Sequence, residues 1–168
     1  MSTVLTPELP VQIAQAAPRI TVVGDVMLDV WLHGRSERLA REAPAPVVDL
    51  AEEIEAGGGA ANTALNLAAL GARVTLVGAI GDDPAGARLR ALLEEAGVDT
   101  TGLVVDPQLA TTTKSRIVVA DQVMVRLDRG AGAPTEATMR AMARGASAGA
   151  PSGVTIGATT GATGGEPL

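Results

Sequence analysis

Apolar positions follow two different periods along the chain, and each period predicts a different kind of element. Continuous apolar runs over 20–24 and 73–80 predict buried strands. Apolar residues at helical spacing over 60–70 and 84–96 predict two helices. Asp83 and Pro84 supply an N-cap and a first helical residue for the second helix, and Gly97 supplies its stop. Alternating strands and helices build a parallel sheet, so we expect an α/β fold.

From residue 111 onward the period changes to two. Lys114–Ala120 and Val123–Leu127 flank Asp121-Gln122, which predicts a β-hairpin. Earlier in the chain, Trp31–Gly34 and Pro46–Leu50 predict two further strands. The hairpin is either a simple sheet edge or part of a small β lid, with lid strands within about 30–51 and 111–128. An amphipathic helix begins near 135–144, with Thr135 as a possible cap.

The two ends of the chain differ from this pattern. Residues 1–18 contain three prolines and are expected to form a flexible leader. Residues 145–168 consist almost entirely of Gly, Ala, Ser, Thr and Pro, with Glu166 as the single charge. Such a segment buries too little apolar area to offset its ordering entropy, so we expect a disordered tail. The folded domain is therefore expected over 19–144.

Composition narrows the class of protein. The chain has 168 residues, a length typical of one domain, and its single Trp without Phe or Tyr predicts a core of Ala, Val, Leu and Ile. The formal net charge of −6 argues against nucleic acid or an anionic membrane as partner. Absence of cysteine excludes disulfides, thiolate nucleophiles and Cys-based metal sites. No apolar run approaches the roughly 20 residues that span a bilayer, and the first 18 residues lack the basic segment and long apolar core of a secretory signal, so a cytoplasmic location is expected.

Three consecutive glycines, Gly57–Gly59, open the helix predicted over 60–70. Glycine lets backbone approach a ligand closely, and unpaired amides gather at a helix N-terminus together with the positive end of its dipole. Asn62 lies in the first turn and can both donate and accept hydrogen bonds, which suits a polyhydroxylated ligand. The alternative is a tight connection between strand and helix with no ligand.

Several motifs in fixed order resemble the N-terminal half of the ribokinase-like (PfkB) sugar kinases. They are Gly24 after a strand, the glycine run with Asn62, and Gly81-Asp-Asp-Pro-Ala-Gly86. Gly24-Asp-Val-Met-Leu-Asp29, Glu42-Ala-Pro-Ala-Pro-Val-Val48 and Thr111-Thr-Thr-Lys114 are most similar to the heptose 7-phosphate kinase domains of bifunctional heptose kinase/ADP-heptose synthases. The likeness covers roughly residues 19 to 142 and does not include the Gly-Ala-Gly-Asp catalytic motif of the family.

The resemblance implies a truncated ribokinase-like, Rossmann-type sheet with a small β lid. It implies ATP-dependent phosphoryl transfer to a sugar hydroxyl, with a heptose 7-phosphate as acceptor and with ATP and Mg²⁺ for a complete family member. No cofactor is assured for this chain, which lacks the catalytic half and is expected to be inactive alone. The alternatives are a non-catalytic sugar-binding or dimerising fragment and the remnant of a truncated gene. Expected partners are a phosphorylated sugar and either a second copy, paired through the lid strands, or a complementing chain.

The resemblance also assigns sugar contacts residue by residue. Asp29 matches the acidic residue that accepts hydrogen bonds from sugar hydroxyls, although an aspartate can also cap a turn. Gly58, Gly59 and Asn62 match the glycines and the asparagine that contact the sugar. Asp25 is either a second polar wall of the site or a strand-end carboxylate.

A phosphorylated substrate needs at least one cation. Lys114 and Arg126 on the predicted hairpin and Arg38 before Glu42 are candidates, with solvated surface charge as the alternative for each. Asp82 and Asp83 look like a metal pair, but Asp83 is better explained as a helix cap, and no metal site is expected. No catalytic residue is identified.

Overall fold

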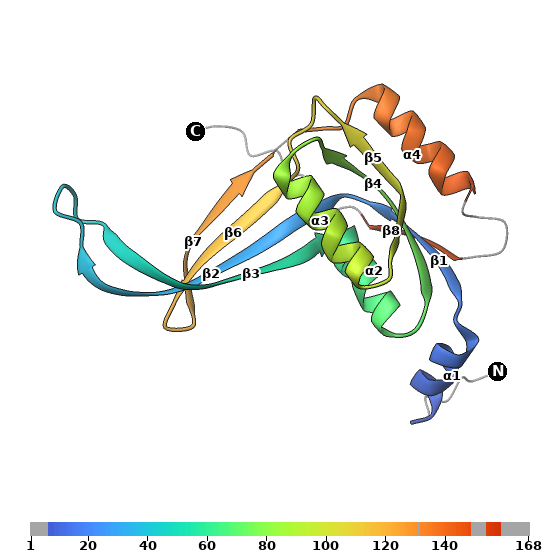
Figure 1. The fold of residues 1–168 in the computed structure, drawn as a ribbon, viewed down its shortest axis with the longest axis horizontal. Helices are drawn as coiled ribbons and strands as arrows, with labels where there is room; N and C mark the ends of the chain where they lie inside the picture. The colour runs from blue at the N-terminus through green and yellow to red at the C-terminus, as the bar shows by residue number, and fades with distance from the viewer. Residues whose placement is uncertain (1–6, 131, 149–153, 159–168) are drawn as a thin grey trace.

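The computed structural model describes residues 7–130, 132–148 and 154–158, which form two four-stranded sheets and four helices (Figure 1). The helices are α1 (Leu9–Ala16), α2 (Ala60–Ala69), α3 (Pro84–Glu95) and α4 (Glu136–Ala148). The strands are β1 (Arg19–Gly24), β2 (Val26–Leu39), β3 (Pro46–Gly59), β4 (Arg73–Gly81), β5 (Asp99–Asp106), β6 (Thr113–Val119), β7 (Gln122–Arg129) and β8 (Val154–Ala158).

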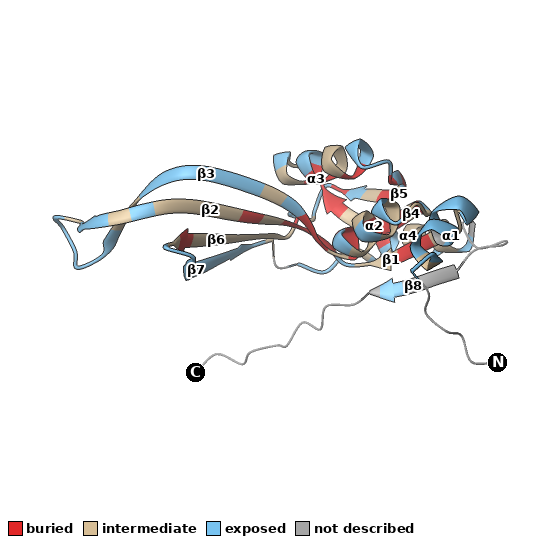
Figure 2. Cartoon of the chain, turned by 90° about the horizontal axis from the view of Figure 1, so that it is seen from below, coloured by how far each residue is buried: buried red, intermediate tan, exposed pale blue. Residues whose placement is uncertain are grey.

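The first sheet is parallel and runs in the order β5-β4-β1-β8. Alternate side chains of β4 point to opposite faces: Leu76 and Ile80 pack in one core with Leu89 and Leu93 of α3, and Val77 lies beside α4. Helices therefore cover both faces, as expected for a doubly wound α/β fold. The buried apolar residues of the described chain (red in Figure 2) are Val, Ala, Leu and Ile together with Met27, which confirms the expected core composition.

The second sheet is the lid, in the order β3-β2-β6-β7, and it projects from the α/β layer in Figure 1. β2 and β3 are antiparallel strands of 14 residues each, and β6 pairs with β2 in parallel. β6 and β7 form the expected hairpin, but its turn is Ala120-Asp121 rather than Asp121-Gln122. Both turn residues have positive φ, 48° and 61°, which is the backbone of a type I′ turn between twisted strands.

Both ends of the chain contain structure where disorder was expected. The leader forms α1 (Leu9–Ala16), which tolerates Pro10 because an amide in the first turn of a helix has no partner within the helix. In the tail, α4 continues to Ala148 and β8 pairs with β1 over Ile20–Gly24. The backbone of β8 adds a parallel strand to the outer edge of β1. The remaining tail residues, 149–153 and 159–168, lie outside the described residues.

Local caps fix where two helices begin. The Asp83 side chain accepts a hydrogen bond from the Gly86 amide at 2.8 Å, and Pro84 is the first residue of α3, as the sequence predicts. Thr135 caps α4 by accepting from the Thr138 amide at 3.2 Å. Of the helices that the structure describes, none has the length and apolar character needed to cross a bilayer.

Candidate functional site

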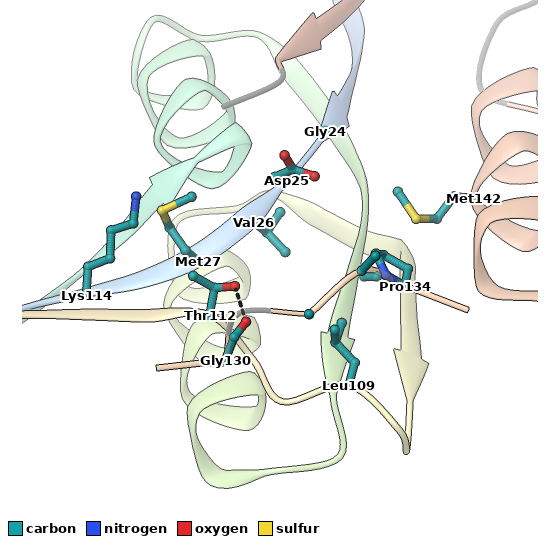
Figure 3. A pocket seen from close by; sticks show the side chains of 13 residues that line it. Gly24, Asp25, Val26, Met27, Leu109, Thr112, Lys114, Gly130, Pro134 and Met142 are labelled. Atoms are coloured by element: carbon teal, nitrogen blue, oxygen red, sulfur yellow. Dashed lines mark hydrogen bonds between the residues drawn. The ribbon is translucent and has the colours of Figure 1, made fainter. Parts of the chain in front are cut away.

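A cavity of about 560 Å³ lies where the carboxyl ends of the parallel strands meet the base of the lid (Figure 3). Lys114 and Met27 point to the same side of the lid sheet, and Asp25 lies at the junction of β1 and β2. The cavity is lined by Gly24, Asp25, Val26, Met27, Ala79, Leu109, Thr112, Lys114, Gly130, Gly132, Ala133, Pro134 and Met142. Ligands of open α/β sheets bind at this end of the strands.

Gly59 ends β3 and caps α2 with a φ of +60°, a conformation that favours glycine. A Cβ at this position would lie 2.5 Å from the Asp25 carbonyl oxygen, so glycine is also required sterically. That carbonyl accepts a hydrogen bond of 2.8 Å from the Ala60 amide, and no side chain caps the helix. The first turn of α2 therefore presents backbone donors and the positive end of the helix dipole beside the lid.

The antiparallel register pairs Gly58 of β3 with Met27 of β2, and Asp29, two residues along on the same face, reaches over Gly58 with its carboxylate. A Cβ on Gly58 would overlap the Asp29 carboxylate and would lie 2.7 Å from Met27 Cγ. The same carboxylate accepts a hydrogen bond of 2.7 Å from Arg116 Nη1, and both side chains are about four-fifths buried, with 23% and 20% exposed. Asp29, Gly58 and Arg116 thus form one compact cluster on the face of the lid that carries Met27.

Two of the three cation candidates, Lys114 and Arg126, lie on the β6–β7 hairpin. Lys114 pairs with Asp29 in the β2–β6 register, so it lies beside the cluster. It also lines the cavity. Arg126 lies opposite Arg116 on the edge strand β7 and donates to Asp128 at 2.8 and 3.0 Å.

The structure does not bring Arg38 to this site. It lies nine positions along β2 from Asp29, a separation on the order of 30 Å in an extended strand. There it forms an exposed ion pair with Asp49 at 3.1 Å. The interpretation of Arg38 as surface charge therefore fits its placement, because the length of β2 carries it to the distal part of the lid.

The remaining candidates lie at the junction of the two sheets. Asn62 is exposed in the first turn of α2, and its Oδ1 accepts a hydrogen bond of 3.1 Å from Asn66. Asp25 lines the cavity through its position between β1 and β2. Asp25 and Lys114 line the cavity, whereas Asp29, Gly58, Gly59 and Asn62 lie outside its lining. That these six residues contact a sugar stays a prediction.

A second set of contacts holds the segment that enters β6. The Thr111 amide donates to Asp83 Oδ2 at 2.8 Å, and the Gly81 amide donates to Thr111 Oγ1 at 2.8 Å. Burial raises the pKa of Asp83, but the hydrogen bonds from the Thr111 and Gly86 amides outweigh this effect and leave the pKa below its ordinary value. Asp83 is thus both a helix cap and an anchor for the lid.

Asp106, at the end of β5, plays a similar anchoring role for α4. The amides of Thr135 and Gln108 and the hydroxyl of Thr138 donate to its carboxylate and lower its pKa to about 2. Within the described residues no three His, Cys, Asp or Glu side chains gather closely enough to hold a metal ion.

Arg116 is the residue that sequence reasoning missed. Its signal was present, because Lys114 and Arg116 are two residues apart in a strand with period two and therefore share a face. The same face carries Trp31, whose ring centroid lies 4.8 Å from the Arg116 guanidinium carbon. The Trp31 ring therefore contacts the cation of the cluster.

Comparisons with known proteins agree with this geometry. Residues 17–143 match the model of the pfkB family of carbohydrate kinases. The chain is 43% identical over 122 residues to the bifunctional protein HldE of Helicobacter acinonychis (strain Sheeba), covering 73% of this chain and 26% of that protein. For the HldE protein of Geobacter metallireducens the identity is 45% over 116 residues, covering 69% and 24%. The chain thus spans about a quarter of the length of these relatives.

Two solved structures share the fold. A putative ribokinase from Agrobacterium tumefaciens superposes with a TM-score of 0.54 and 26% identity, covering 67% of this chain and 35% of that one. The ribokinase of Cryptococcus neoformans var. grubii serotype A, solved in complex with ADP, gives a TM-score of 0.53 and 26% identity, covering 83% and 49%. Their partial coverage fits a partial ribokinase-like domain.

Proposed function

The chain belongs to the pfkB family of carbohydrate kinases, and from that premise we propose that its lid junction is the sugar-binding half of an ATP-dependent kinase. The proposed acceptor is a heptose 7-phosphate, and ATP with Mg²⁺ is the proposed phosphoryl donor. The identity to HldE proteins supports the heptose, and the ADP complex of a neighbouring ribokinase supports the nucleotide. The observation that carries the proposal is the largely buried Asp29 carboxylate held against Gly58, next to the start of α2, which no side chain caps.

The chemistry of the cluster suits a sugar. A carboxylate accepts hydrogen bonds from two adjacent hydroxyls, and the amides of a helix N-terminus donate to hydroxyl oxygens. Gly58 lets the Asp29 carboxylate pack directly against the backbone of β3, and Gly59 does the same for the Asp25 carbonyl, because neither position carries a Cβ. Holding the acceptor rigidly is itself a large part of catalysis in phosphoryl transfer, which depends on alignment and charge stabilisation.

Calorimetric titration with a heptose 7-phosphate tests the proposal. We expect binding by the wild type and a loss of affinity in Asp29→Asn, which keeps the size of the side chain but removes its charge. Absence of heat at millimolar sugar would contradict the proposed function. The sequence contains no Gly-Ala-Gly-Asp motif, so we expect ADP release by this chain alone at background rate in a coupled assay. Turnover above background would show that the chain is active by itself.

We also propose that the lid edge pairs with a second copy of the chain. All eight residues of β7 are exposed, and they include the apolar side chains of Val123, Met124, Val125 and Leu127. An unpaired apolar edge strand is a template for pairing with an identical strand. Light scattering over a range of concentrations tests this: we expect a dimer for the wild type and a monomer for Val125→Lys. A concentration-independent monomer mass for the wild type would contradict it.

A further inference from the structure

Arg116 is held between two partners on the adjacent strand. Its Nη1 donates to Asp29 at 2.7 Å, and its guanidinium carbon lies 4.8 Å from the centroid of the Trp31 ring. Asp29 and Trp31 are two residues apart on β2, so both lie on the face of the lid sheet that carries Gly58. The ring and the carboxylate together restrict the guanidinium to one position, although Arg side chains are otherwise flexible.

We propose that Arg116, with Lys114 beside it, recognises the anionic group of the acceptor sugar and makes the site selective for phosphorylated sugars. The inference rests on the proposed function, because it requires a sugar at Asp29. Arg116 is a specificity-determining residue in this scheme, and Asp29 has two tasks: it accepts sugar hydroxyls and it positions the guanidinium.

The donors of Arg116 favour this role. Among the described residues, the recorded hydrogen bonds of Arg116 all leave from Nη1, to Asp29 and to the Lys114 carbonyl at 3.5 Å. Nη2 and Nε therefore remain for a ligand, and a planar fork of N–H groups matches the geometry of phosphate. Lys114 adds a point charge on the same face and lines the cavity.

The same arrangement disfavours a neutral sugar. A sugar hydrogen-bonded to Asp29 covers Arg116, since the two side chains are in direct contact and only 20% of Arg116 is exposed beforehand. Covering a cation without supplying an anion removes its water and leaves its donors unsatisfied, which penalises binding. An anionic sugar supplies the missing acceptors, so the desolvation of Arg116 weakens binding of the neutral sugar only.

The single tryptophan makes the test direct. Trp31 is the only Trp and the chain has no Tyr or Phe, so its fluorescence reports the ring under Arg116 alone. We would titrate a heptose 7-phosphate and the same heptose without phosphate into the wild type, Arg116→Gln and Arg116→Lys. The matched control is Arg140→Gln, which removes an exposed guanidinium paired with Glu136 on α4, away from the lid.

For the wild type we expect at least about tenfold tighter binding of the phosphorylated sugar, with a change in Trp31 emission, as two charge-assisted hydrogen bonds imply. Arg116→Gln should lose most of the preference and keep only the part that Lys114 contributes. Arg116→Lys should recover part of the loss, and Arg140→Gln should keep the full preference. Should Arg116→Gln not fold, the reduced preference of Arg116→Lys carries the test.

Two results overturn the inference in different ways. If the wild type binds both sugars equally, or if both Arg116 variants keep the full preference, Arg116 does not select the anion and the proposed function stands. If the wild type binds neither sugar, the proposed function fails and the inference fails with it.

Discussion

Substituting Gly58 with alanine places a methyl group where the Asp29 carboxylate lies. The new Cβ would overlap Asp29 Oδ2 and would come within 2.7 Å of Met27 Cγ. Gly58 does not have a positive φ, so the backbone accepts alanine, and the whole effect of the substitution falls on these two side chains. Asp29 must rotate away, which stretches its 2.7 Å hydrogen bond with Arg116.

The size of the effect follows from these contacts. Added volume at a packed position costs about 1–3 kcal/mol of stability, and we expect the lower part of this range because the Asp29 side chain is 23% exposed and can relax. Losing the hydrogen bonds of a charged group to a ligand costs about 1.5–3 kcal/mol, which corresponds to an affinity for the sugar lower by about 10- to 150-fold.

Calorimetry with a heptose 7-phosphate measures the affinity, and a thermal melt shows that Gly58→Ala is folded at the assay temperature. Gly145→Ala is the matched control, because its Cβ would lie 3.8 Å from the nearest Val77 atom, an ordinary contact. We expect Gly145→Ala to bind like the wild type and to be slightly more stable, since alanine favours a helix over glycine. A folded Gly58→Ala that binds the sugar with wild-type affinity would refute the reasoning about Asp29 and Gly58.

Three further predictions concern residues outside the Asp29 cluster. Arg38→Gln should leave sugar affinity unchanged and lower stability by less than about 1 kcal/mol, because its ion pair with Asp49 is 63% and 61% exposed; calorimetry and urea unfolding check both. Asp83→Ala should cost about 1–3 kcal/mol in urea unfolding, since it removes a helix cap and the acceptor of the Thr111 amide, and Asp82→Ala should cost little. The Asp106 pKa falls from 3.8 to about 2 on folding, so its stabilising contribution is complete above the unfolded pKa and is lost as the pH falls through 2. Asp106→Asn should therefore flatten the decrease of the urea midpoint between pH 5 and pH 2, and an unchanged slope would show that other carboxylates cause it.

Sequence predicted the elements whose signals are local. The cap at Asp83 and the glycines before α2 depend on residues within one turn of each other, so short-range pattern is enough to find them. The α/β class follows from the alternation of strands and helices in the same way. By contrast, β8 depends on an open edge at β1, more than a hundred residues away, and composition alone argued against it.

The residues of the candidate site also differ in whether they depend on local sequence or on contacts between distant segments. Asp29 and Gly58 were found as motif residues, but the partner of Asp29 is Arg116, 87 residues further along the chain. Only the parallel pairing of β2 with β6 brings the two together. Arg38 was a poor candidate for the opposite reason, since nearness in sequence to Asp29 becomes a long separation within one extended strand.

The connection between β1 and β2 consists of Asp25 alone. Because the carbonyl of this residue also receives the Ala60 amide, the backbone that joins the two sheets is tied to the start of α2. A rotation of the lid would change the backbone of Asp25 and, through this hydrogen bond, would act on the start of α2. We therefore expect a change in the position of the lid to change the orientation of the first α2 amides.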